Sequence, residues 1–232
     1  MPQLSAKDRL ATTALRRAVA IPFLYFGIQI VAARFVPGYS FLNRDASTLG
    51  SEASTQPWIF NAASIALGVI TLVAAWGFLQ TFKRLEVNTA VAWLTCLAIA
   101  AFGVGCINAG VFPLPDARHT AGPLAILGMG SFVLPPLLAA ALWRLPRARG
   151  LKVFLIVNVA VWLALLPILS GLIQVLLVNT GAQWPAYQNL LNDYHGLLQR
   201  IVALIILAPI GAAAYALAGR ISLPLSESPA AR

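Results

Sequence analysis

Six long apolar segments, separated by short polar loops, dominate the pattern of this chain. They cover residues 17–36, 58–82, 89–112, 122–143, 153–178 and 196–219. Each is close to the ~20 residues that an α-helix needs to cross the hydrocarbon core of a bilayer. The pattern therefore predicts an all-α fold, a bundle of six transmembrane helices.

The composition agrees with a polytopic membrane protein. Of 232 residues, 59% are hydrophobic and 10% are charged, whereas an average soluble domain has about 25% charged residues. We expect no nucleic-acid partner despite the net charge of +9, because the basic residues lie in short loops between the apolar segments. We expect a cytoplasmic N-terminal segment (1–16), a transmembrane domain (17–219) and a disordered cytoplasmic tail (220–232) that is rich in Pro and Ser.

Lys and Arg are distributed unequally between the two ends of the predicted bundle. One end has Lys7, Arg9, Arg16, Arg17, Lys83, Arg84, Arg144, Arg147, Arg149, Lys152, Arg220 and Arg232, and the other has only Arg34, Arg44, Arg118 and Arg200. The positive-inside rule places the first end and both termini in the cytoplasm. A cleavable signal peptide is the alternative for the first apolar segment, but this segment is long for one and no A-x-A site follows it.

Polar side chains are costly inside a membrane, so their positions carry information. Most of those in this chain fall in the outer half of the bundle: Asn61, Asn108, His119, Ser170, Gln174, His195, Gln199 and Arg200. The second, fourth and sixth segments begin at this end, where helix N-termini carry partial positive charge. Pro22 and the Pro135-Pro136 pair lie within predicted spans and should bend them.

We therefore expect a pocket in the outer leaflet that binds a membrane lipid headgroup or another small polar or anionic ligand. Arg200 is the expected anion anchor. The expected hydrogen-bond partners are His195, Gln199, Asn61, His119 and Asn108. The same residues could instead cap helices, join helices by hydrogen bonds or extend to headgroups, as in a purely structural subunit. The pattern assigns no catalytic residue.

A metal-dependent hydrolase of lipid esters or amides is the main alternative. His119 and His195, with Asp116, Asp193 or Asp45, would form a nitrogen and oxygen ligand set suited to zinc. The chain has no HExxH motif. Two further alternatives are weaker: haem held by both histidines, and transport, for which no continuous polar path is visible. Cys96 and Cys106 are separated by about 15 Å of helix, which excludes a disulfide between them.

Four segments resemble the bacterial and archaeal membrane family known as domain of unknown function 998. They are Ser47-Thr48-Leu49-Gly50, Trp58-Ile59-Phe60-Asn61, Gly110-Val111-Phe112-Pro113 followed by His119, and Gly196-Leu197-Leu198-Gln199-Arg200. The resemblance spans most of the chain and implies a six-helix integral protein of the plasma membrane. It implies no activity.

Overall fold

The computed structural model describes residues 5–146, 148–169 and 185–221, and every regular element in these ranges is helical. The longer helices are α1 (Ala6–Ala18), α2 (Ile21–Ala33), α3 (Pro57–Arg84), α4 (Thr89–Val111), α7 (Leu134–Leu142), α8 (Arg149–Leu169) and α10 (Pro185–Ile221). Shorter pieces are α5 (Arg118–Ala121), α6 (Pro123–Met129) and the 3-10 helices η1 (Ala46–Gly50) and η2 (Gly130–Val133).

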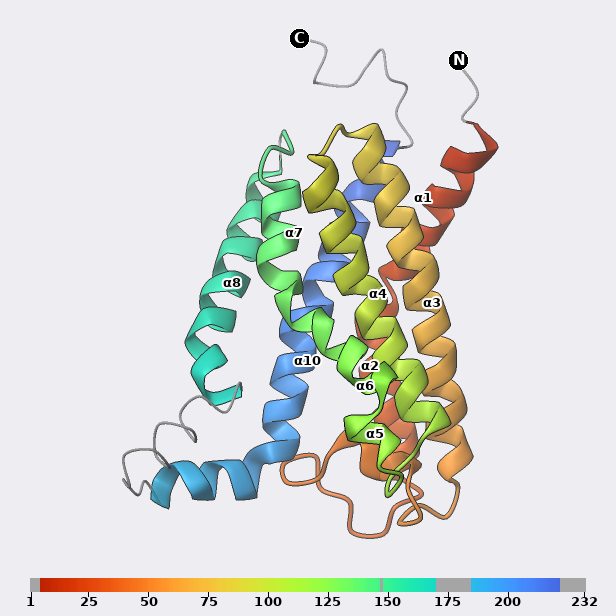
Figure 1. Ribbon diagram of the computed structural model, residues 1–232, viewed down its shortest axis with the longest axis vertical. Helices are drawn as coiled ribbons and strands as arrows, with labels where there is room; N and C mark the ends of the chain where they lie inside the picture. Colours follow the sequence, from red (N-terminus) through yellow and green to blue (C-terminus); the bar gives the residue numbers. More distant parts are fainter. Residues whose placement is uncertain (1–4, 147, 170–184, 222–232) are drawn as a thin grey trace.

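The helices form one elongated bundle, as the apolar pattern predicts (Figure 1). Within the described residues, five helical segments are long and apolar enough to span a membrane, and α1 with α2 makes a sixth if this bent pair is one span. The all-α prediction is therefore confirmed. The beginning of α1 and the end of α10 lie at the same end of the bundle. That this end faces the cytoplasm stays a prediction. We call the other end of the bundle, away from the beginning of α1 and the end of α10, the outer end.

Two of the spans are broken near the prolines at which the sequence predicts bends. The axes of α1 and α2 differ by 42°, and Pro22 in the first turn of α2 has no N–H to donate to the carbonyl of Ala18. The fourth span is divided into α6, η2 and α7. Pro135 and Pro136 likewise leave the carbonyls four residues earlier, within η2, without helical donors. The predicted cytoplasmic segment 1–16 is helical from Ala6 onward, as part of α1. It is attached to the bundle by an ion pair, in which the Asp8 carboxylate lies 3.8 Å from the guanidinium of Arg84 in α3.

Small residues bring the central helices into close contact. A Cβ atom on Gly68 of α3 would lie 2.5 Å from the carbonyl oxygen of Gly103 in α4, so the two backbones touch there. A Cβ atom on Gly77 would lie 2.8 Å from the methyl group of Ala14 in α1. Such contacts are typical of membrane helices, where close packing replaces the hydrophobic effect as the force between helices.

Residues 34–56 connect α2 to α3 across the outer end of the bundle. We call residues 39–47 of this connection the outer strap. The strap lies against the beginning of the spanning part of α10, where Leu197 N–H donates to Leu42 O over 2.8 Å. The helix α10 bends at Tyr194, whose φ of −126° is not helical. The part of α10 before this bend projects sideways from the bundle, below α8 in the view of Figure 1.

Candidate functional site

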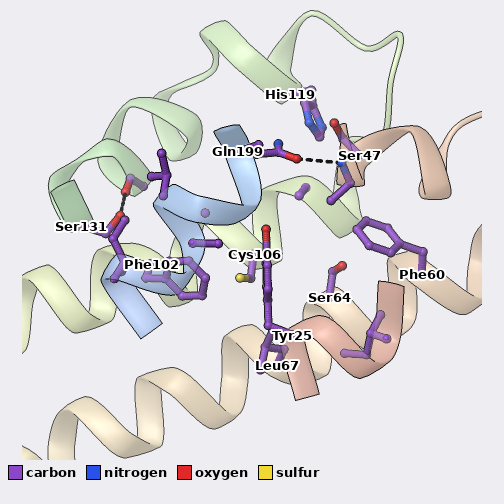
Figure 2. A pocket seen from close by; sticks show the side chains of 18 of the residues that line it. Tyr25, Ser47, Phe60, Ser64, Leu67, Phe102, Cys106, His119, Ser131 and Gln199 are labelled. Carbon is purple, nitrogen blue, oxygen red and sulfur yellow. Dashed lines mark hydrogen bonds between the residues drawn. The ribbon is translucent and has the colours of Figure 1, made fainter. Parts of the chain in front are cut away.

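A cavity of about 250 Å³ lies between the helices toward the outer end. We call it the outer cavity. Side chains and backbone of α2, η1, α3, α4, α5, α6, η2 and α10 surround it (Figure 2). Its lining residues are Tyr25, Ile28, Ala46, Ser47, Phe60, Ser64, Leu67, Phe102, Gly105, Cys106, Ala109, His119, Gly128, Ser131, Phe132, Gln199, Val202, Ala203 and Ile206.

The walls of the outer cavity are mostly apolar and include no Asp, Glu, Lys or Arg among the described lining residues. Polar groups gather at one end, where His119, Gln199 and Ser47 lie together in Figure 2. The ring of Tyr25 stands in the cavity with its hydroxyl pointing toward that end. The cavity therefore combines a polar end with an apolar body, the arrangement usual in small-molecule sites.

His119 lines the cavity, and one of its two ring nitrogens is engaged with the main chain. Its Nδ1 lies 2.8 Å from the carbonyl oxygen of Phe112. A carbonyl can only accept, so neutral His119 carries its proton on Nδ1 and leaves Nε2 as an acceptor. The buried side chain of Asn108 supports this turn, because its Nδ2 donates to the carbonyl oxygens of Arg118 at 3.2 Å and His119 at 3.0 Å.

Gln199 is oriented in the same way by a main-chain group. Its Oε1 accepts a hydrogen bond from the N–H of Ala46 over 2.7 Å. The amide Nε2 then keeps its two protons for another partner. Ser64 is 7% exposed and lines the cavity, and its hydroxyl has no hydrogen-bond partner among the described residues.

Arg200 does not line the outer cavity but holds the outer strap. Its Nη1 donates to the carbonyl oxygens of Phe41 at 3.0 Å, Arg44 at 3.0 Å and Gly196 at 2.7 Å, and its Nη2 donates to the Tyr39 hydroxyl. The guanidinium also lies over the Phe41 ring, 4.9 Å from its centroid. Both terminal nitrogens of the guanidinium thus bond to the strap or to α10, whereas the buried Nε has no partner among the described residues. Its expected role as an anion anchor stays a prediction.

Two pairs of ionisable residues at the outer end lie outside the cavity. His195 is exposed, and its Nε2 lies 3.8 Å from Asp45 Oδ1 of the strap. Asp116 accepts hydrogen bonds from the side chain of Arg118, the shortest at 2.6 Å, and from its main-chain N–H. These bonds lower the pKa of Asp116 to about 2. Asp116 therefore pairs with Arg118, whereas Arg200 makes its bonds to carbonyls and a phenol.

The structure does not assemble the expected zinc ligands. Within the described residues, no group of three or more His, Cys, Asp or Glu side chains could hold a metal ion. Of the expected ligands, His119 lines the cavity, whereas His195 pairs with Asp45 and Asp116 pairs with Arg118. Ser170 and Gln174 lie outside the described residues.

The cavity uses residues that the polar pattern did not single out. Tyr25, Ser47, Cys106 and Ser131 all line it. Tyr25 and Cys106 lie within apolar segments, where a phenol and a thiol are ordinary packing residues. The only available signal was that η1, which carries Ser47, is one of the segments of the family resemblance.

The segments that carry that resemblance meet one another beside the cavity. Asn61 Nδ2 donates to the Gly50 carbonyl oxygen over 3.0 Å, and Gly110 packs against the backbone of Asn61 so closely that a Cβ atom would overlap it. The hydrogen bond between Gln199 and Ala46 joins the segment 196–200 to the residue that precedes the segment 47–50. Asn61 itself does not line the cavity but connects two walls that do.

Comparisons with known proteins agree with this resemblance. A family described as "Protein of unknown function (DUF998)" matches residues 18–216. No curated protein and no solved structure matches the chain. Because the family match covers most of the chain, from the last residue of α1 nearly to the end of α10, the chain belongs to the DUF998 family.

Proposed function

We propose that the outer cavity binds a small uncharged molecule from the membrane, one with a hydrogen-bonding end and an apolar body. The observation that carries the proposal is the pairing of an uncharged lining with free hydrogen-bonding groups. Gln199 supplies an amide donor, Ser64 a hydroxyl and His119 an acceptor nitrogen. An ionic ligand would lose its hydration without gaining a counter-charge, which costs several kcal/mol or more.

The size of the cavity limits the ligand further. A dry protein cavity of about 150 Å³ accommodates benzene, which has six non-hydrogen atoms. By proportion, 250 Å³ suits a molecule or molecular fragment of about ten non-hydrogen atoms. A whole phospholipid is much larger than this, so a lipid ligand would place only part of itself inside.

The sequence predicts a site for a lipid headgroup or a small polar or anionic ligand. Of these ligands, the proposal keeps only the uncharged ones. Arg200 acts in it as a positioning residue, because its bonds to Phe41 and Arg44 hold the strap that carries Ala46 and Ser47. No group of described side chains favours a metal-dependent hydrolase. No reaction is assigned.

Native mass spectrometry of the protein released from membranes tests the proposal. We expect a bound neutral molecule on the wild type and a lower occupancy on H119A and on Q199M, since each change removes about 1–2 kcal/mol of hydrogen bonding and weakens the affinity about 5- to 30-fold. The matched control is H195A, which alters the exposed histidine outside the cavity and should retain the ligand. Equal occupancy on all four proteins, or a charged ligand that R200M releases, would contradict the proposal.

A further inference from the structure

The aromatic side chains of the outer cavity point to a flat ring as the bound group. Tyr25, Phe60, Phe102 and Phe132 line it from α2, α3, α4 and η2. Aromatic side chains prefer the faces and edges of other rings at centroid separations of about 4.5–7 Å. Tyr25 and Phe102 already meet each other in this way, with centroids 6.0 Å apart and planes 60° apart. A planar ligand could continue this arrangement, whereas a flexible acyl chain would gain nothing specific from it.

The polar groups define what that ring must carry. The Gln199 amide and the Ser64 hydroxyl can donate hydrogen bonds into the cavity, and His119 Nε2 can accept one. Ring carbonyls satisfy the two donors, and a ring hydroxyl satisfies His119 while still accepting from the others. A ring whose oxygens change between carbonyl and hydroxyl fits both kinds of group. We propose, on the basis of the function proposed above, that the ligand is the headgroup of a membrane quinone or quinol.

Size and position agree with such a headgroup. A substituted quinone ring has about ten non-hydrogen atoms, the number that the cavity volume suggests. Its isoprenoid tail would have to leave the cavity for the lipid. At the 3-10 helix η2, Ser131 and Phe132 line the cavity while the next residue, Val133, is 50% exposed on the outside of the bundle. We assign the exit of the tail to this 3-10 segment, which interrupts the span before Pro135.

Equilibrium binding in lipid nanodiscs tests this inference. The probe is a benzoquinone with a fully substituted ring and one isoprene unit, measured by its absorbance, and the same compound in its reduced form. We expect one saturable site per protein. S64F should fill the cavity and lower the affinity at least tenfold. H119L should weaken the quinol by about tenfold and the quinone by less, because Nε2 bonds only to a ring hydroxyl; a general loss of structure would weaken both equally.

The control H195L should bind both forms like the wild type, and all variants are compared by circular dichroism and elution volume. Q199M provides a second cavity variant if S64F fails to fold, and should weaken both forms. Quinone binding that is no stronger on the wild type than on the cavity variants overturns the inference. If monoolein, a neutral amphiphile without a ring, then binds the wild type and not the variants, the proposed function stands without the quinone. If neither probe distinguishes them, both proposals fail.

Discussion

Gln199 Oε1 and the main-chain N–H of Ala46 form a hydrogen bond of 2.7 Å between residues 153 positions apart. The bond has two consequences. It attaches the strap to α10 beside the cavity, and it decides which end of the amide is left free for a ligand. Because the oxygen is used by Ala46, the side chain offers the cavity a donor.

This division of roles predicts different effects for two substitutions at Gln199. Q199E keeps an acceptor for Ala46 but has no N–H to offer, whereas Q199M loses both. We expect both variants to lose ligand about tenfold, and Q199M to lose in addition about 1–2 kcal/mol of stability from the unpaired Ala46 N–H. Ligand occupancy by native mass spectrometry and thermal unfolding in detergent measure the two effects. Full occupancy on Q199E would show that the amide donor does not contact the ligand.

Arg200 should matter more for stability than any other charged residue at the outer end. The residue is 8% exposed, and its guanidinium donates to three carbonyl oxygens and to the Tyr39 hydroxyl. Burial raises the pKa of Tyr39, so the phenol stays protonated and donates onward to Asp45 O at 3.0 Å. R200M should cost ~3 kcal/mol of unfolding free energy.

The matched control for R200M is R34M, because Arg34 is an exposed arginine at the same end. We expect R34M to unfold within about 0.5 kcal/mol of the wild type. Thermal unfolding and proteolysis of residues 39–47 measure the difference. Equal stability of R34M and R200M would show that the strap does not depend on Arg200.

Gly196 should tolerate no side chain. A Cβ atom there would lie 2.8 Å from Arg44 N and closer still to Arg44 O, in the backbone of the strap. G196A should therefore destabilise the protein by about 1–3 kcal/mol and loosen the strap. The control is G27A in α2, where nothing lies within 4 Å of the added atom and the better helix former should be neutral or stabilising. The unfolding temperatures of the two variants test this prediction. An unfolding temperature of G196A equal to or above that of G27A would contradict it.

The two cysteines offer a probe of cavity occupancy. Both are buried in α4, but Cys106 lines the cavity and Cys96 does not. N-ethylmaleimide, itself about ten atoms in size, should label Cys106 at a rate that falls when ligand is bound, whereas labelling of Cys96 should not respond. Peptide mass spectrometry after timed labelling follows both sites at once. A ligand that slows the labelling of both cysteines equally would contradict the prediction, because it would act on the stability of the whole protein and not on the cavity.

The turn before His119 should resist acid. The unshifted pKa of an aspartate is 3.8, and that of Asp116 is about 2 because Arg118 donates to its carboxylate. A lowered carboxyl pKa stabilises the folded form above the unfolded value, and the effect disappears as the pH falls through the folded value. The Arg118 N–H, which donates to Asp116 over 2.8 Å, should thus stay protected from hydrogen exchange at pH 4 and lose this protection near pH 2. At pH 4 the Arg118 N–H should exchange faster in D116N than in the wild type. Equal exchange rates in the two proteins would exclude the hydrogen bond to the Asp116 carboxylate.

The fold was largely predictable because the physics of spanning a bilayer is local. Apolar run length locates the spans, and the prolines at 22, 135 and 136 locate the breaks by removing N–H donors. His119 and Gln199 could be chosen as cavity residues because polar groups within or beside an apolar run need a partner or a site. Each of these inferences uses only the residue and its close neighbours in sequence.

The role of Arg200 could not be predicted in this way. Its partners include main-chain carbonyls at Phe41 and Arg44, more than 150 residues away, and any residue type supplies a carbonyl. Tyr25 and Cys106 were missed for a related reason, since their presence in the cavity depends on which face of a mostly apolar helix is covered. Only the packing of α2 against α4 and α10 decides that.

A density map of the purified protein that resolves side chains tests the central claim most directly. We predict non-protein density inside the outer cavity, within hydrogen-bond distance of His119 Nε2 and Gln199 Nε2 and in contact with Phe102 and Phe132. A map in which those aromatic side chains fill the space themselves, or in which a bound molecule contacts Arg200 outside the cavity, would contradict the account.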